Sequence, residues 1–271
     1  MLAISLLPSC FAMFFGLIFG SFINVITYRL PKNKSILKPR SFCPNCKKTI
    51  PWHENIPILS WIRLKGKCSS CNQLISKNYP ITEVLTGILF LLSFKAIPSD
   101  VNFANFIFTL ISNWALIIVL IPISIIDSFY LWIPNSLIKV GIGLGFLISI
   151  IFSFLNYQNI FIDLIERLIS GIIGFLIIII IIKFGELIYK KPVMGVGDAK
   201  LAGMLGIWLG FPGVLISIWI SFLIAGVFVI LGLFFKKISK GQLIPFGPFL
   251  SISGFLTWIY SSDVFLKIIF K

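Results

Sequence analysis

Residues 164–183, LIERLISGIIGFLIIIIIIK, contain an almost unbroken run of apolar side chains. A helix needs about 20 mainly apolar residues to cross the hydrocarbon core of a bilayer, and this stretch has that length. The stretch therefore predicts a transmembrane helix. It is one of several such runs in the chain, and together they decide the fold.

The composition of the whole chain agrees with this interpretation. Of the 271 residues, 58% are hydrophobic and only 12% are charged, with a mean hydropathy of +1.04. Soluble globular domains do not have this balance. We predict an all-α polytopic membrane protein, a bundle of about eight transmembrane helices. The eight apolar runs cover roughly residues 3–27, 81–97, 103–126, 136–155, 164–183, 199–211, 213–235 and 247–262.

The basic residues predict the topology. About half of the 23 Lys and Arg residues lie between Arg29 and Lys77, in a hydrophilic loop that the positive-inside rule places in the cytoplasm beside anionic lipid. Alternate threading of the spans puts the other basic connections on the same side. Membrane topology thus accounts for the net charge of +14, and no nucleic-acid partner is expected. No basic residue precedes Arg29, so residues 1–28 are expected to be an uncleaved first span.

The basic loop contains two Cys-x-x-Cys pairs, CPNC at 43–46 and CSSC at 68–71. Two such pairs on tight turns supply the four thiolates of a tetrahedral zinc site. A redox dithiol and a pair of disulfides are the alternatives, but a cytoplasmic loop disfavours disulfides. We therefore expect a small cytoplasmic zinc-knuckle subdomain with structural Zn²⁺ on Cys43, Cys46, Cys68 and Cys71.

Two aspartates stand out among nine acidic residues. Asp127 lies in IDSFYLWIPN (126–135) and Asp198 in GVGDAKL (195–201), and the threading puts both at the cytoplasmic face. Gly195 and Gly197 are expected to allow positive φ angles and close backbone approach beside Asp198. Ionisable residues at the ends of membrane spans are candidates for function.

Two neighbouring carboxyl groups can share a proton, so that one acts as a general base on water and the other as a general acid toward a carbonyl. This chemistry hydrolyses peptide bonds without His, Ser or a catalytic metal. An alternative is a cation-coupled membrane transporter that uses Asp127 and Asp198. A third possibility is a scaffold in which the zinc loop is the working part and the two aspartates are helix caps.

Eight short motifs follow one another along nearly the full length of the chain: GSFINVITYRLP (20–31), CPNC (43–46), NIPILSW (55–61), CSSC (68–71), YPITEVLTG (79–87), IDSFYLWIPN (126–135), GVGDAKL (195–201) and PFGPFL (245–250). In this order and at this spacing, they resemble the motifs of the bifunctional type IV prepilin peptidases, membrane aspartic proteases of the GxGD type that are also N-methyltransferases.

The resemblance implies a catalytic pair, Asp127 and Asp198, framed by Gly195 and Gly197. It implies cleavage of the leader peptide of type IV prepilins and pseudopilins after a glycine, at the cytoplasmic side of a bacterial inner membrane. N-methylation of the new N-terminus with S-adenosylmethionine would follow, and Gly20 and Glu83 are the candidate cofactor-binding residues.

The expected organisation then has three parts. Residues 1–28 form the first transmembrane helix, residues 29–80 the cytoplasmic loop with the methyltransferase part, and residues 81–271 the peptidase core.

Overall fold

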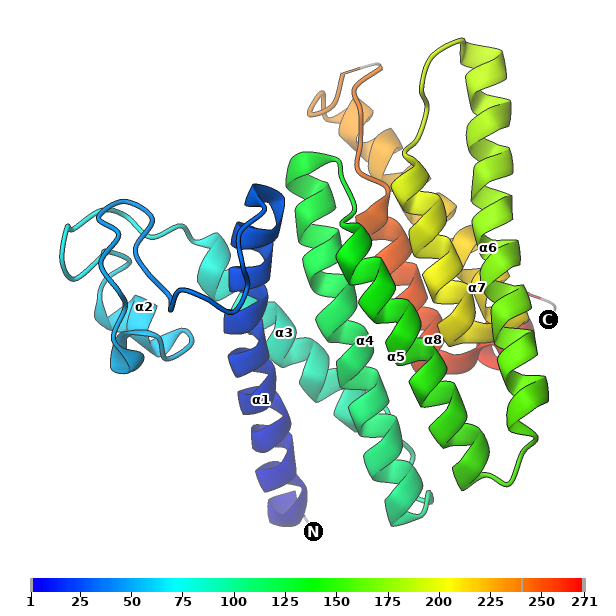
Figure 1. Ribbon diagram of the computed structural model, residues 1–271, viewed down its shortest axis with the longest axis horizontal. Helices are drawn as coiled ribbons and strands as arrows, with labels where there is room; N and C mark the ends of the chain where they lie inside the picture. Colours follow the sequence, from blue (N-terminus) through cyan, green and yellow to red (C-terminus); the bar gives the residue numbers. More distant parts are fainter. Residues whose placement is uncertain (1, 240, 270–271) are drawn as a thin grey trace. The chain divides into compact units, whose positions relative to one another are not determined.

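The computed structural model describes the backbone of residues 2–239 and 241–269 and the side chains of residues 7–239 and 241–260. Its described residues form helices and no β-strand, with only two isolated β-bridges in the basic loop. The α-helices are α1 (Leu2–Arg29), α2 (Leu59–Arg63), α3 (Asn78–Lys95), α4 (Phe103–Tyr130), α5 (Asn135–Leu155), α6 (Ile160–Tyr189), α7 (Val196–Phe234) and α8 (Gly247–Ile269) (Figure 1). The chain divides into two compact units, Met1–Val101 and Asn102–Lys271.

The predicted all-helical membrane class is confirmed. Within the described residues, five segments are long and apolar enough to cross a membrane: Leu7–Lys32, which contains most of α1, and helices α4, α5, α6 and α7. We expected about eight spans, and fewer segments than that meet the length and hydropathy of a membrane span. The polar residues Asn78 and Glu83 in the first two turns of α3 lower its hydropathy, and the side chains of α8 are described only to residue 260.

In the first unit, α1 and α3 pack closely because glycine lies at their contact. A Cβ on Gly16 would lie 2.7 Å from the Cα of Gly87, and a Cβ on Gly20 would lie 2.6 Å from the Cα of Glu83. No side chain fits at that spacing. Helix α3 therefore belongs to the compact unit of α1, and the unit boundary falls after Val101, whereas we expected the peptidase core to begin at residue 81.

In the second unit, α7 has two legs that meet at Gly210, where φ is 71° and ψ is −179°. A Cβ on Gly174 of α6 would lie 2.7 Å from the carbonyl oxygen of Ala202 and 2.8 Å from Cγ2 of Val214. Twelve residues of straight helix would separate those two residues by about 18 Å. The chain therefore folds back at Gly210, and the legs of α7 correspond to the expected sixth and seventh spans.

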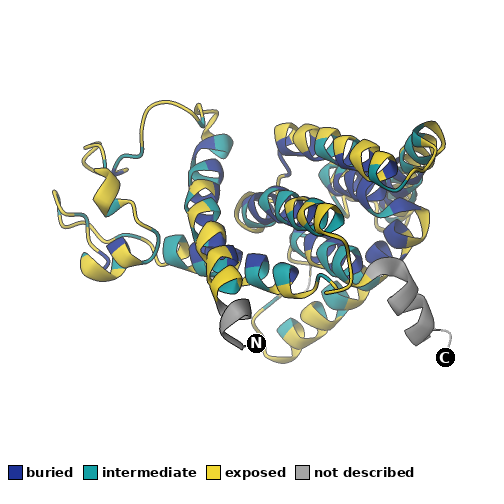
Figure 2. Cartoon of the chain, turned by 90° about the horizontal axis from the view of Figure 1, so that it is seen from below, coloured by how far each residue is buried: buried dark blue, intermediate teal, exposed yellow. Residues whose placement is uncertain are grey.

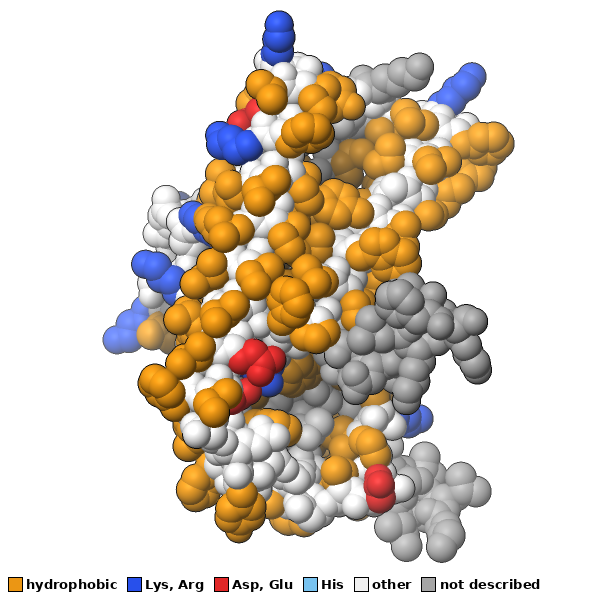
Figure 3. Space-filling model, turned by 90° about the vertical axis from the view of Figure 1, so that its right-hand side faces the viewer, with side chains coloured by type: hydrophobic (Ala, Val, Ile, Leu, Met, Phe, Trp, Pro, Cys, Tyr) orange, Lys and Arg blue, Asp and Glu red, His pale blue; other side chains and the backbone are white. Residues whose placement is uncertain are grey.

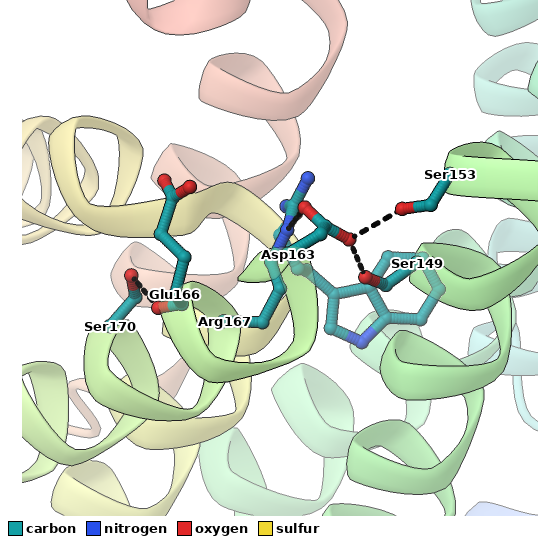
Figure 4. Close-up of polar contacts among 7 residues, drawn as sticks. Ser149, Ser153, Asp163, Glu166, Arg167 and Ser170 are labelled. Carbon is teal, nitrogen blue, oxygen red and sulfur yellow. Dashed lines mark hydrogen bonds and ion pairs between the residues drawn. The ribbon is translucent and has the colours of Figure 1, made fainter. Parts of the chain in front are cut away.

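The turn between the legs of α7 is held by a cluster of polar side chains (Figure 4). The Asp163 carboxylate pairs with Arg167 at 3.3 Å and accepts hydrogen bonds from Ser149 and Ser153 of α5. Arg167 Nη1 donates to the carbonyl oxygen of Trp208 at 2.6 Å. In a continuous helix that oxygen would accept from residue 212, but residue 212 is proline and has no N–H group.

The second unit has a buried centre and an apolar outer surface, as a lipid-embedded bundle requires. Trp208 is buried at the centre and donates from Nε1 to the carbonyl oxygen of Gly141 at 2.8 Å. Buried residues line the inner sides of the helices, and exposed residues lie on the outer sides (Figure 2). Hydrophobic side chains cover much of the face seen in Figure 3. Ile172, Leu176 and Ile180 of α6 are among the exposed hydrophobic residues.

Candidate active site

Asp127 lies in the last turn of α4 and is 5% exposed. The helix ends three residues later because Leu131 takes the left-handed conformation, with φ of 51°, and its N–H donates to the backbone carbonyl of Asp127. The carboxyl group points to the start of α8, where the N–H of Gly247 donates to Asp127 Oδ2 at 2.9 Å. Asp127 is thus anchored by a helix that lies 120 residues further along the chain.

Asp198 lies in the first turn of α7 and is 7% exposed. Its carboxyl group hydrogen-bonds to the backbone of Gly195, and the charge of Asp127 acts on it electrostatically. Among the described residues, its Oδ1 has no hydrogen-bond partner although it is buried. The fold therefore brings the two predicted aspartates together, and it leaves one carboxyl oxygen available for a further polar group.

Of the two glycines before Asp198, Gly197 is in close contact with a neighbouring segment, and neither glycine has a positive φ. Gly195 is the N-cap of α7 with φ of −82°, and neither Gly195 nor Gly197 is among the residues with positive φ. A Cβ on Gly197 would lie 3.1 Å from Cβ of Ile133, in the segment that follows Asp127. The expectation of positive φ was wrong, whereas the expected close contact is present.

Two further contacts complete this region, and neither was predicted from the sequence. The first is the Gly247 amide on Asp127. The second joins α7 to α5, because Lys200 Nζ donates to Asn135 Oδ1 at 2.8 Å. Their motifs, PFGPFL and GVGDAKL, were noted for their resemblance, but a backbone amide leaves no chemical trace in the residue type.

The four cysteines of the basic loop form one cluster in the first unit. Their sulfur atoms all lie within 4.8 Å of one another, and the sulfurs of Cys43 and Cys71 are 3.9 Å apart. Each pair is followed by a residue with positive φ, Lys47 or Asn72, and is flanked by one β-bridge. The expected knuckles are therefore present. The Gln73 amide and the Asn45 side chain lower the pKa of Cys71 to about 6, which favours a thiolate.

A cavity of about 390 Å³ lies beside this cluster, within the first unit. Aromatic side chains and two carboxylates line it, together with Cys43 and Cys68; the main ones are Tyr28, Phe42, Trp61, Tyr79, Glu54 and Glu83. Glu83 is 7% exposed and accepts hydrogen bonds from the Ile58 amide, at 2.8 Å, and from Ser21. Gly20 does not line the cavity and lies at the contact of α1 with α3, next to Glu83.

Comparisons with known proteins match the two units separately. Residues 14–97 match the model of the bacterial peptidase A24 N-terminal domain, and residues 114–230 match the type IV leader peptidase family. No solved structure matches the chain.

Similar proteins include the prepilin leader peptidase/N-methyltransferase of Stutzerimonas stutzeri, which is 31% identical over 93% of this chain and 91% of its own length. Proteins of the same name from Pseudomonas aeruginosa and Neisseria gonorrhoeae are each 30% identical, over 92% of this chain and 89% of their own length.

Proposed function

The chain belongs to the family of prepilin leader peptidase/N-methyltransferases, and we propose that its two units carry the two activities of that name. The second unit removes the leader peptide of type IV prepilins and of pseudopilins, cutting after a glycine. The first unit methylates the N-terminus that this cleavage exposes, with S-adenosylmethionine as the methyl donor. The comparisons give no support to the alternative of a cation-coupled transporter.

One observation supports the peptidase most directly: two buried aspartates meet at the ends of α4 and α7. The charge of Asp127 acts on Asp198, and two carboxyl groups whose charges interact do not both ionise readily, so we infer that the pair carries one proton. An aspartic peptidase requires this protonation state, because its dyad must take up one proton and supply another in the same step.

The reaction then follows from the pair. Water attacks the carbonyl carbon of the scissile peptide bond while the ionised aspartate takes a proton from that water. The protonated aspartate donates its proton to the carbonyl oxygen, which gives a neutral tetrahedral diol. Collapse of the diol breaks the C–N bond: the aspartate that took the proton from water gives it to the leaving amine, and a hydroxyl group of the diol gives its proton to the other aspartate. The dyad ends with one proton, as it began.

The cavity of the first unit supports methyl transfer. Its volume is in the range of small-molecule sites, and its aromatic walls and two carboxylates suit a flat, partly cationic ligand. Bound S-adenosylmethionine would supply an electrophilic methyl group. The aromatic side chains would hold its base and its sulfonium, and Glu54 and Glu83 would face its positive charges. Gly20 contributes by letting α3 approach α1, which sets the position of Glu83.

The four cysteines fit a closed structural zinc site. Tetrahedral Zn–S bonds of about 2.3 Å place sulfurs about 3.8 Å apart, and the Cys43 and Cys71 sulfurs are 3.9 Å apart. Zinc would tie the two knuckles together and so fix one wall of the cavity, because Cys43 and Cys68 line it. With four protein ligands the ion has no open position for catalysis.

The proposed location is the bacterial inner membrane, with both sites on the cytoplasmic side. The basic loop supports this orientation through the positive-inside rule. Prepilin leaders are short and basic, and their cut sites border a long apolar helix. A multi-pass protein with its dyad at the ends of helices suits such a substrate.

The test is cleavage of a model prepilin with glycine at the cut site by purified protein in detergent or membranes. We expect the wild type to release the leader, and Asp127→Asn and Asp198→Asn each to lose cleavage by at least about 1,000-fold. Asp100→Asn is the matched control because Asp100 is exposed and lies outside both sites. The proposal fails if folded wild type leaves the prepilin intact, or if either variant of the dyad cleaves normally.

A further inference from the structure

The start of α8 meets the carboxyl group of Asp127 with no side chain between them. The Gly247 N–H donates to Asp127 Oδ2 at 2.9 Å. A Cβ on Gly247 would lie 2.7 Å from that same oxygen and 3.1 Å from Cγ of Asp127. Contacts under about 3.0 Å do not persist, so the carboxyl group occupies space that any side chain at residue 247 would need.

We propose that Gly247 is a positioning residue for the peptide-cleaving dyad, acting through its amide and through its missing side chain. The amide fixes one oxygen of Asp127, and the bare Cα leaves room for the carboxyl group to sit there. This inference rests on the proposed peptidase function.

The donor stands on a well-anchored element. Two aromatic pairs attach the start of α8 to the second leg of α7: Phe246 packs on Phe222 at 4.8 Å between ring centroids, and Phe249 packs on Phe228 at 5.3 Å. Deeper in the helix, Ser253 pairs with Ser217 of α7 at 3.2 Å. The Gly247 amide therefore cannot follow Asp127 if the carboxyl group moves.

The two carboxyl groups are held differently, and this suggests how the dyad is organised. Oδ2 of Asp127 is committed to Gly247, whereas Oδ1 of Asp198 is buried and has no partner within the described residues. An N–H donor is complementary to a carboxylate oxygen, so Gly247 favours Asp127 as the charged member of the pair. Asp198 is then the protonated member, and its unpaired oxygen is the one that donates a proton to the scissile carbonyl.

The decisive variant is Gly247→Ala, which keeps the amide and adds one methyl group. The methyl must displace the Asp127 carboxyl group, and a displacement of about 1 Å can cost about 100-fold in rate. We expect kcat for leader cleavage to fall by about that factor, while KM for the prepilin changes little. Methylation of an already cleaved pilin peptide should stay at the wild-type rate, because that cavity lies wholly in the first unit.

Two matched controls are Gly143→Ala in α5 and Gly226→Ala in α7, since a Cβ at either position meets nothing within 4 Å. Both should cleave as the wild type does. If wild type and Gly247→Ala cleave with the same kcat, the inference is overturned while the proposed function stands. If wild type itself does not cleave, the proposed function has failed. The stability test below still shows whether Gly247 and Asp127 interact.

That second test is a double-mutant cycle on thermal unfolding in detergent. Gly247→Ala should lower the melting temperature of the wild type. It should lower that of Asp127→Ala much less, because Oδ2 and Cγ, the two atoms that the new methyl approaches most closely, are then absent. Additive changes in the two backgrounds would show that Gly247 and Asp127 act independently, and the positioning role would be excluded.

Discussion

At the scale of single residues, Glu83 holds Ile58 in a conformation that β-branched residues seldom adopt. Ile58 has φ of 60° and ψ of −53°, and its N–H donates to Glu83 Oε2 at 2.8 Å. A positive φ at a β-branched residue is costly and persists only when its surroundings enforce it. Glu83 thus has two separable roles: it shapes the cavity wall through Ile58, and it offers a negative charge to a bound ligand.

Two substitutions separate these roles. Glu83→Gln keeps an oxygen that can accept from Ile58 but removes the charge, whereas Glu83→Ala removes both. If the charge binds the cofactor, Glu83→Gln should raise KM for S-adenosylmethionine about tenfold, the equivalent of about 1.4 kcal/mol. The measurement is methylation of a cleaved pilin peptide at varied cofactor concentration.

Leader cleavage by the same preparations is the control and should be unchanged in both variants. A wild-type KM in Glu83→Gln, combined with a large loss in Glu83→Ala, would contradict the charge role and leave only the shaping of Ile58.

The residues of the dyad could be predicted from sequence, whereas their neighbours could not. Asp127 and Asp198 are carboxylates at the ends of apolar segments, where burial demands an explanation. Gly247 acts through its backbone, and a glycine at the start of an apolar run carries no such signal. The positive φ angles expected before Asp198 are absent, and Gly197 instead allows close contact with Ile133, a contact that the order of residues does not reveal.

At the scale of elements, α7 shows both the power and the limit of apolar patterns. The pattern placed a break at residues 211–213, and the fold-back occurs at Gly210, so the reversal was predicted within a residue or so. The stabilisation of this reversal was not predicted, because the sequence shows Arg167 only as a charged residue within the apolar run at 164–183. The partner of Arg167 is a carbonyl oxygen that Pro212 leaves without a donor, and that need arises only once the helix is broken.

Arg167→Met should therefore loosen the hairpin of α7. It removes a charged donor from a partly buried carbonyl, an interaction worth about 2 kcal/mol, and it also leaves Asp163 without its ion pair. We expect a lower melting temperature in detergent. At temperatures where the wild type is active, the leg of α7 that carries Asp198 should unfold and peptide cleavage should be lost.

Lys183→Met is the matched control on the same helix. Lys183 pairs with Glu186 at 3.0 Å, but its side chain is 73% exposed, and such pairs contribute little. Equal melting temperatures for Arg167→Met and the wild type would mean that the turn at Gly210 holds without the guanidinium group.

At the scale of the whole molecule, the two candidate sites lie in different units. The cysteine cluster and the cavity involve only residues of Met1–Val101, and the dyad with its contacts involves only residues of Asn102–Lys271. The predicted clustering of the four cysteines is confirmed, and Asp127 and Asp198 remain the predicted dyad. The expected peptidase core, residues 81–271, included α3, which here packs against α1. An apolar run predicts that a helix forms, but it does not predict which helix it packs against. The packing partner of α3 is determined by the glycine contact between α1 and α3.

This division predicts that removal of the metal silences one activity and spares the other. Cys43→Ser and Cys68→Ser should each reduce bound zinc from about one ion per chain to nearly none, because a structural site needs all four thiolates. Methylation should then fall by at least about tenfold as the cavity wall formed by Cys43 and Cys68 is lost. Leader cleavage should stay within about twofold of the wild type.

Metal content by mass spectrometry and both activities are measured on the same preparations, with Cys10→Ser as the matched control. Cys10 is an exposed thiol of α1 outside the cluster, so its loss should change neither zinc nor activity. Zinc loss that abolishes cleavage as well would contradict the division, since the dyad would then depend on the fold of the first unit. If zinc is lost and methylation stays intact, the function of the cavity does not depend on the zinc knuckles beside it.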